Sequence, residues 1–175
     1  MNSNCLRLAA AASLLTLGAC ASMMGPGGAV AVLSPTNGNS ASGSVRFTPS
    51  AQGVQVSGEI RGLKPNAVHG FHVHEKGDCS SPDAMSAGGH FNPGGSPHGN
   101  FEAATHHAGD LPSLKADAGG TVKFDFATRS LTVGDKGPND VVGKGLIVHR
   151  DPDDYTTQPT GNSGPRIACA VIAAG

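Results

Sequence analysis

The sequence predicts an all-β domain, either an antiparallel sandwich or a flattened barrel, on three observations. Glycine and proline are abundant, with 26 and 12 residues, which disfavours long helices and suits short strands joined by turns. Short runs of alternating polar and apolar residues recur along the chain, and Gly, Pro or Asn clusters separate most of them. No amphipathic stretch is long enough to predict a helix, and the sequence has no internal repeat.

Two runs show the alternation clearly. GVQVSGEI (53–60) places its two valines and its isoleucine on one face, and TVKFDFAT (121–128) does so with a valine and two phenylalanines. The other expected strands are 29–33, 44–47, 130–133, 145–148 and 167–172. Two long stretches break this rhythm, from about Glu75 to Leu114 and from Arg150 to Pro165. Loops of this length are usually functional or disordered, and we expect these two to be functional.

Length and charge limit the classes of protein to consider. A chain of 175 residues is long enough for one domain with a buried core. With 38% hydrophobic residues and a net charge of −1, the chain is not expected to be disordered. The same charge gives no basic surface for nucleic acid, so no nucleic-acid partner is expected. Any attraction of anions must be local.

The first twenty residues resemble an export signal. Arg7 supplies a positive charge, and the apolar stretch at 8–17 is too short to span a bilayer. The following LGAC resembles a bacterial lipobox, which implies cleavage before Cys20 and a lipid anchor on that residue. By the same resemblance, Ala21 favours the outer membrane. The alternative is an ordinary export signal that leaves Cys20 as a spare thiol.

The chain therefore divides into a signal peptide (1–19), a flexible tether (20–28) and a domain (29–175). We expect the protein on the periplasmic side of the cell envelope, as an outer-membrane lipoprotein. Export leaves Cys79 and Cys169 as a pair in an oxidising compartment, where a disulfide between them is expected. The alternative is two buried free thiols.

The segment HGFHVHEKGDC (69–79) contains three of the eight histidines. Alternate residues of a strand share a face, so His72 and His74 point the same way, about 7 Å apart. Two imidazoles side by side on a rigid strand can chelate one metal ion. Alone this motif is weak, and the alternative is a solvated pair.

The long loop downstream strengthens the metal hypothesis. It carries three histidines and a carboxylate at successive intervals of eight, nine and three: His90, His98, His107 and Asp110. Three imidazoles and one carboxylate form a plausible tetrahedral zinc set. His149 ends the apolar strand at 145–148, where a lone histidine is more often structural. Because a metal held by His72 and His74 needs further ligands, His149 becomes the natural third ligand.

Taken together, these motifs resemble the copper/zinc superoxide dismutases. The resemblance covers essentially the whole domain and rests on GFHVHEKGDC, GGHFNP with the HG and HHAGD elements after it, LIVHRDPDD and GNSGPRIACAVI. It implies an eight-stranded antiparallel Greek-key β-barrel or sandwich with two long functional loops. It also implies an enzyme that converts superoxide, a small anion, to dioxygen and hydrogen peroxide. Bacterial members are monomers or homodimers, and the resemblance does not fix which applies here.

The resemblance further implies two adjoining metal sites. The copper ligands would be His72, His74, His90 and His149. The zinc ligands would be His90, His98, His107 and Asp110. His90 would bridge the two metals through both ring nitrogens and take up a proton during turnover. Copper would cycle between two oxidation states, and zinc would organise the loop.

Two further residues receive roles from the resemblance. Asp153 would link a copper-ligand imidazole to a zinc-ligand one and fix both rings, and the alternative is one more solvated acid beside Asp154. Arg166 would hold the anion beside copper, and the alternative is a surface arginine paired with an acid in 151–154. His69 is expected to be structural and His106 exposed.

A metal-binding module without turnover is a second hypothesis for function. Related domains of that kind tend to lack copper ligands or the arginine, whereas this chain has all of them. The enzyme is therefore the preferred interpretation.

Overall fold

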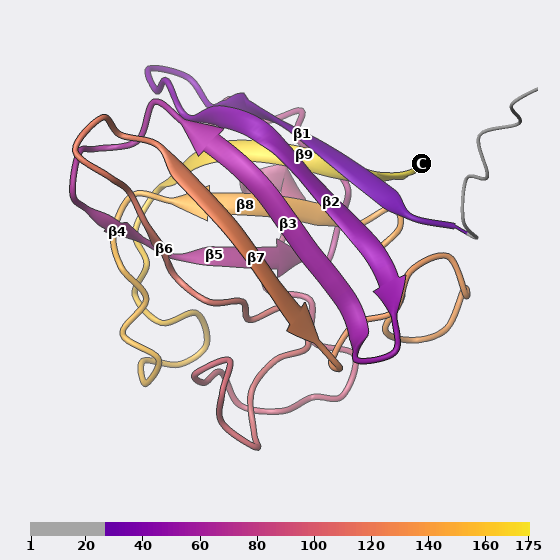
Figure 1. Ribbon diagram of the computed structural model, residues 1–175. Coiled ribbons are helices and arrows are strands. Elements are labelled where there is room, and N and C mark those ends of the chain that lie inside the picture. The colour runs from indigo at the N-terminus through magenta and orange to yellow at the C-terminus, as the bar shows by residue number, and fades with distance from the viewer. Residues whose placement is uncertain (1–26) are drawn as a thin grey trace, which may run out of the picture.

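The computed structural model describes residues 27–175 (Figure 1). The predicted signal peptide and Cys20 lie outside the described residues. The elements in chain order are β1 (Ala29–Pro35), β2 (Ser42–Ser50), β3 (Gly53–Arg61), β4 (Val68–His69), β5 (Phe71–His74), the 3-10 helix η1 (Met85–Ala87), β6 (Leu114–Lys115), β7 (Val122–Thr128), β8 (Gly145–His149) and β9 (Arg166–Ala174). Within residues 27–175, no helix is long and apolar enough to cross a membrane.

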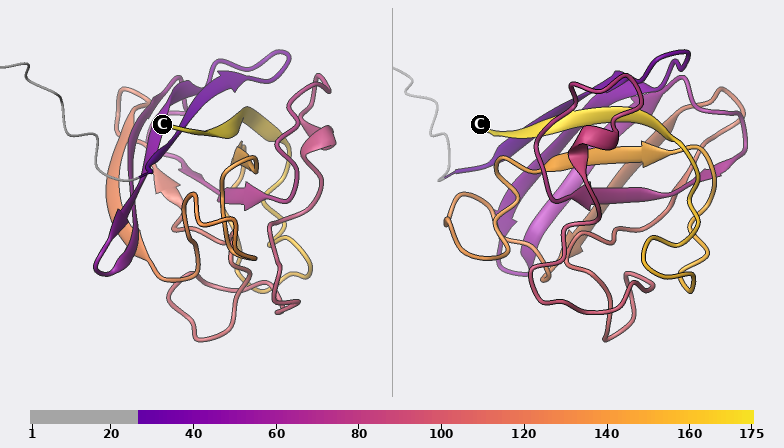
Figure 2. Two further views of the ribbon diagram at one scale, coloured as in Figure 1. Left: turned by 90° about the vertical axis from the view of Figure 1, so that its right-hand side faces the viewer. Right: turned by 180° about the vertical axis from the view of Figure 1, so that it is seen from behind.

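The strands form one curled antiparallel sheet and a small second one. The seven-stranded sheet has the order β5-β8-β9-β1-β2-β3-β7, and β4 pairs with β6. Figure 2 shows the curl, which brings the β5–β8–β9 layer across from the β1–β2–β3–β7 layer. Only Gly70 separates β4 from β5, so that the two count as one interrupted strand. This architecture confirms the expected eight-stranded Greek-key barrel.

The core lies between the two layers of the curled sheet. The alternation predicted for 53–60 is confirmed, because Val54, Val56 and Ile60 of β3 are all buried. On the opposite layer, Phe71 and Val73 of β5 belong to the same core. Their neighbours His72 and His74 are also fully buried, although they point away from that core. Something other than the sheet must therefore cover the outer face of β5.

The two long loops provide this cover. Residues 75–113 connect β5 to β6, and residues 150–165 connect β8 to β9. Within the first loop, η1 lies on the outer side of the β5–β8–β9 layer, where its Ala87 packs against Ile147 of β8 (Figure 2). A disulfide between Cys79 and Cys169 confirms the predicted pairing and ties the same loop to β9.

One predicted strand, 130–133, is absent from the sheet. Thr132 forms only an isolated bridge with Asp140. The Asp140 carboxylate accepts hydrogen bonds from the backbone N–H groups of Gly134, Lys136 and Val142. These bonds curl the chain into a local turn, and a curled chain cannot continue as a sheet strand.

Candidate metal centre

Four histidines from three parts of the chain meet on the outer face of β5. His72 and His74 come from β5, His149 ends the neighbouring strand β8, and His90 comes from the first long loop. One ring nitrogen of each lies within 4.8 Å of those of the other three, and all four side chains are buried. His149 is far from His72 and His74 in the sequence, but the pairing of β5 with β8 brings them together.

Hydrogen bonds outside this cluster determine which ring nitrogens face it. His74 Nδ1 donates to the Gly88 carbonyl (2.9 Å) and His149 Nδ1 donates to the Gly164 carbonyl (3.0 Å). Their Nε2 atoms are then left facing one another, 3.4 Å apart. His72 Nδ1 and His90 Nε2 are buried and have no hydrogen-bond partner among residues 27–175. A buried nitrogen without a partner is costly, and a metal ion among these four atoms would satisfy both.

A second cluster adjoins the first and shares His90. Its ligand atoms, one each from His90, His98, His107 and Asp110, also lie within 4.8 Å of one another. Asp110 Oδ1 lies 2.9 Å from His90 Nδ1 and 3.0 Å from His98 Nδ1. Asp110 Oδ2 instead accepts the backbone N–H groups of His107 and Gly99, which fixes the carboxylate. Three imidazoles and one held carboxylate are a suitable donor set for zinc.

Asp153 joins the two clusters from the second long loop. Its Oδ2 lies 2.6 Å from His72 Nε2, and its Oδ1 lies 2.9 Å from His98 Nε2. The side chain is buried, in contrast to the solvated acid that the alternative assumed. One carboxylate therefore fixes the orientation of a ring in each cluster.

Burial governs the protonation of the first cluster. It disfavours the charged imidazolium and lowers the pKa of His72 to about 4, although the hydrogen bond to Asp153 opposes this. Burial likewise holds the pKa values of His74 and His149 well below their usual range, and nearby positive groups lower them further. These rings are neutral at physiological pH, which is the form that binds metals.

In the second cluster burial lowers the pKa of His107, but at His98 and Asp110 hydrogen bonds outweigh burial. Burial opposes the charged form of His98, but hydrogen bonds to Asp110 and Asp153 raise its pKa to about 9. Burial would raise the pKa of Asp110, yet the hydrogen bonds from His90 and His98 hold it far below its usual range. Once His98 gives up its proton, three neutral imidazoles and one carboxylate form a donor set suited to a divalent cation.

Arg166 lies beside the first cluster and is held by backbone carbonyls. It is the register partner of His149, across β8 and β9. Its two terminal nitrogens donate to the carbonyls of Ala84 (2.6 Å) and Gly88 (2.5 Å). Among the described residues no carboxylate forms an ion pair with it, and the acid-paired arginine of this region is Arg150. The guanidinium is half-buried and retains N–H groups that can donate further hydrogen bonds.

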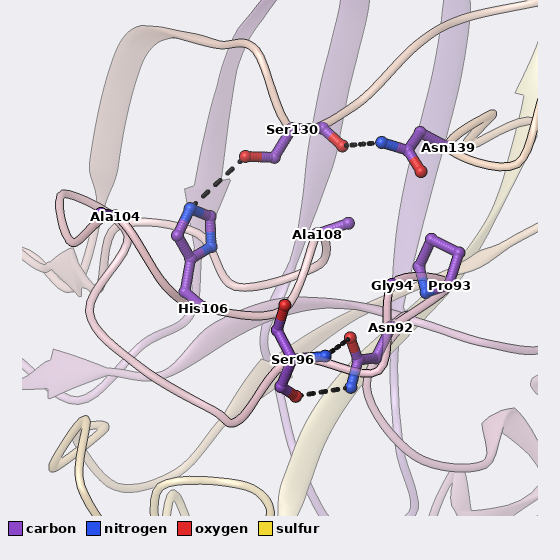
Figure 3. A pocket seen from close by; sticks show the side chains of 9 residues that line it. All are labelled: Asn92, Pro93, Gly94, Ser96, Ala104, His106, Ala108, Ser130 and Asn139. Carbon is purple, nitrogen blue, oxygen red and sulfur yellow. Dashed lines mark hydrogen bonds between the residues drawn. The ribbon is translucent and has the colours of Figure 1, made fainter.

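The two histidines left out of the predicted sets lie outside both clusters. His69 Nδ1 donates to the backbone carbonyl of His149 (2.9 Å), in keeping with a structural role. His106 was expected to be exposed but is half-buried, and its ring lines a small pocket of about 210 Å³ (Figure 3). There its Nε2 lies 3.4 Å from Ser130 Oγ. The predicted choice of His107 over His106 agrees with the clustering of its ring atoms.

The structure also shows contacts that sequence reasoning missed. The Gly88 carbonyl accepts hydrogen bonds from both His74 and Arg166, and Gln158 binds the backbone of His98. Gly88 and Gly89 stand before His90, and glycines there signal a close backbone approach, so that the sequence does carry a signal at Gly88. Nothing in the local sequence pattern identifies Gln158.

An antiparallel barrel that carries two buried ligand clusters with a shared imidazole defines a dinuclear metalloprotein. The family model for copper/zinc superoxide dismutase matches residues 41–172. The chain belongs to this family, whose members use copper and zinc, and its two clusters could hold these metals. Family membership supports superoxide dismutation as the activity of the chain.

Relatives cover most of the chain. An extracellular copper/zinc superoxide dismutase of Brugia pahangi is 39% identical over 154 residues, 83% of this chain and 75% of its own. A copper/zinc superoxide dismutase of Aquifex aeolicus is 39% identical over 133 residues, 74% and 78% of the two chains. A crystal structure of a superoxide-dismutase-like protein from Bacillus subtilis matches with a TM-score of 0.73 at 36% identity, over 81% of this chain and 95% of its own.

Proposed function

We propose that the protein is a superoxide dismutase of the cell envelope with a copper site and a zinc site that share His90. The proposed copper ligands are His72, His74, His90 and His149. The proposed zinc ligands are His90, His98, His107 and Asp110. The observation that carries the proposal is the position of His90. Its Nδ1 lies in the carboxylate-containing cluster, while its Nε2 is buried and has no partner in the part of the chain that the structure describes.

The donor atoms support this division of the metals. Four imidazole nitrogens without a carboxylate suit copper, whereas three imidazoles with one carboxylate suit a closed structural zinc site. When bound, copper supplies the one-electron redox chemistry of dismutation, and zinc supplies charge and order without redox chemistry.

The residues of the chain contribute positioning and proton transfer. His90 Nδ1 faces Asp110, so that Nε2 is the atom that can hold and release a proton. Arg166 presents its remaining N–H groups to the anionic substrate beside His149. Asp153 keeps His72 and His98 in fixed orientations through both of its oxygens.

The proposed location is the periplasmic side of the envelope, with the protein anchored through a lipid on Cys20. Three features support it: the resemblance of residues 1–20 to a lipoprotein signal, the disulfide, and the extracellular relative of Brugia pahangi. We further propose the division into signal peptide (1–19), tether (20–28) and domain (29–175), with the domain acting as a monomer or homodimer.

Metal analysis combined with a dismutation assay tests the proposal. The purified protein should contain one copper and one zinc and turn over superoxide rapidly. The variant His72→Ala should lose copper preferentially, and His107→Ala should lose zinc preferentially. Full metal loading without turnover would instead indicate a metal-binding module.

A further inference from the structure

The side chain of Gln158 binds both backbone groups of His98. In a β-strand, the backbone of a neighbouring strand would bind such groups. The His98 N–H donates to Gln158 Oε1 (2.8 Å), and the His98 carbonyl accepts from Gln158 Nε2 (2.9 Å). Within residues 27–175, no backbone group pairs with either group of His98. His98 is buried, so that without Gln158 two buried polar groups would lack partners.

The loop around Gln158 is itself tied in place. The Asp154 carboxylate accepts the backbone N–H groups of Thr156 (2.9 Å) and Thr157 (2.8 Å). The Asp154 N–H donates to the Gly161 carbonyl (2.9 Å), and the Gly161 N–H donates to the Thr157 carbonyl (2.7 Å). These bonds close a compact turn on both sides of Gln158, which fixes the direction of its amide.

The same loop also grips the ring of His98. Asp153 Oδ1 lies 2.9 Å from His98 Nε2. A Cβ on Gly161 would lie 2.5 Å from His98 Nε2 and 1.8 Å from Asp153 Oδ1, so that only glycine fits at this position. With Nε2 and both backbone groups occupied, Nδ1 is the one polar atom of His98 directed at the second cluster.

We propose that Gln158 is a positioning residue for the second cluster, which fixes the backbone of His98 so that Nδ1 faces the other three ligands. The inference rests on the proposed function, which makes His98 a zinc ligand. His98 lies in a long loop, between strands β5 and β6, where no sheet partner restrains it. A ligand ordered before the metal arrives binds more tightly, because less freedom is lost on binding.

Cobalt retention by the purified protein tests the role of Gln158. Co²⁺ serves as a coloured probe of the zinc-type site, and a chelator removes it at a measurable rate. Gln158→Leu keeps the volume of the side chain but removes both hydrogen bonds, and should accelerate Co²⁺ release roughly 10- to 100-fold. Gln158→Glu keeps an acceptor for the His98 N–H and loses the donor, and should give an intermediate rate. Gln52→Leu, in an exposed turn, is the matched control and should release Co²⁺ as the wild type does.

Two further measurements separate positioning from general destabilisation. In Gln158→Leu the visible Co²⁺ bands should change, and copper release from the first cluster should stay at the wild-type rate. Co²⁺ release within twofold of the wild type in both Gln158 variants would overturn the inference, as would equal acceleration of release from both clusters. If Gln158→Leu does not fold, the Co²⁺ and copper release rates of Gln158→Glu test the inference in its place. A His98→Ala variant that retains Co²⁺ like the wild type would instead overturn the zinc assignment itself.

Discussion

The ring orientations of individual histidines in this protein are set by hydrogen-bond partners that are far away in the sequence. Spacing and family resemblance predict which histidines gather, because the H-x-H pair lies on one strand and the loop ligands follow in order. The sequence does not reveal which nitrogen each ring presents. That choice depends on remote acceptors, such as Gly164 for His149 and Asp153 for His72.

Neutralising Arg166 should slow the enzyme. Arg166→Gln removes the positive charge that lies opposite His149 in the β8–β9 pairing, and kcat/KM should fall about tenfold or more because this local charge no longer attracts superoxide. The dependence of the rate on ionic strength should weaken at the same time. Steady-state assays over a range of salt concentrations check both effects.

Arg150 offers a matched control for this experiment. It is exposed and already paired with Asp151, so that Arg150→Gln should leave the rate nearly unchanged. Equal rates for Arg166→Gln and the wild type would contradict the anion-binding role.

At the scale of elements, strands were easier to predict than contacts between loops. The alternation in 53–60 and 121–128 directly reflects one buried face, and both become strands. The run at 130–133 has similar composition, but Asp140, several residues away, curls the chain there. Gln158 could not be predicted for a related reason. Its side-chain amide binds the backbone of His98, and a single contact of this kind leaves no periodic pattern in the sequence.

The stability of the metal-free protein should depend on pH, because His72 on β5 and His98 in the first long loop change their pKa values on folding. The pKa of folded His72 is lowered to about 4, so its contribution to stability is lost as pH falls from about 6.5 towards 4. The pKa of folded His98 is raised to about 9, so its contribution is present below about 6.5 and lost as pH rises towards 9. The free energy of unfolding should therefore be greatest near pH 6.5.

Denaturant unfolding of the chelator-treated protein between pH 4 and 9 measures this profile. His98→Asn should flatten its alkaline side, whereas His106→Gln, outside both clusters, should leave the shape unchanged. A stability that rises steadily up to pH 9 would contradict the charged state assigned to His98.

For the molecule as a whole, the sequence predicts a cellular location. The residues that predict it, the signal peptide and Cys20, lie outside the described residues. If Cys20 carries a lipid, Cys20→Ser should move the protein from the membrane fraction to the soluble fraction of the periplasm, with activity per molecule unchanged. Fractionation of cells followed by immunoblotting checks this. Membrane retention of the Cys20→Ser variant would contradict the lipid anchor.

The carbonyl of Gly88 has a consequence for how the site tolerates motion. His74 of the first cluster and Arg166 beside that cluster both donate to this one oxygen. A displacement of Gly88 would therefore strain a hydrogen bond to each of two side chains that are anchored in different strands, β5 and β9. The orientations of the His74 ring and of the Arg166 guanidinium therefore share one dependence, so that a change in this loop would disturb both side chains together.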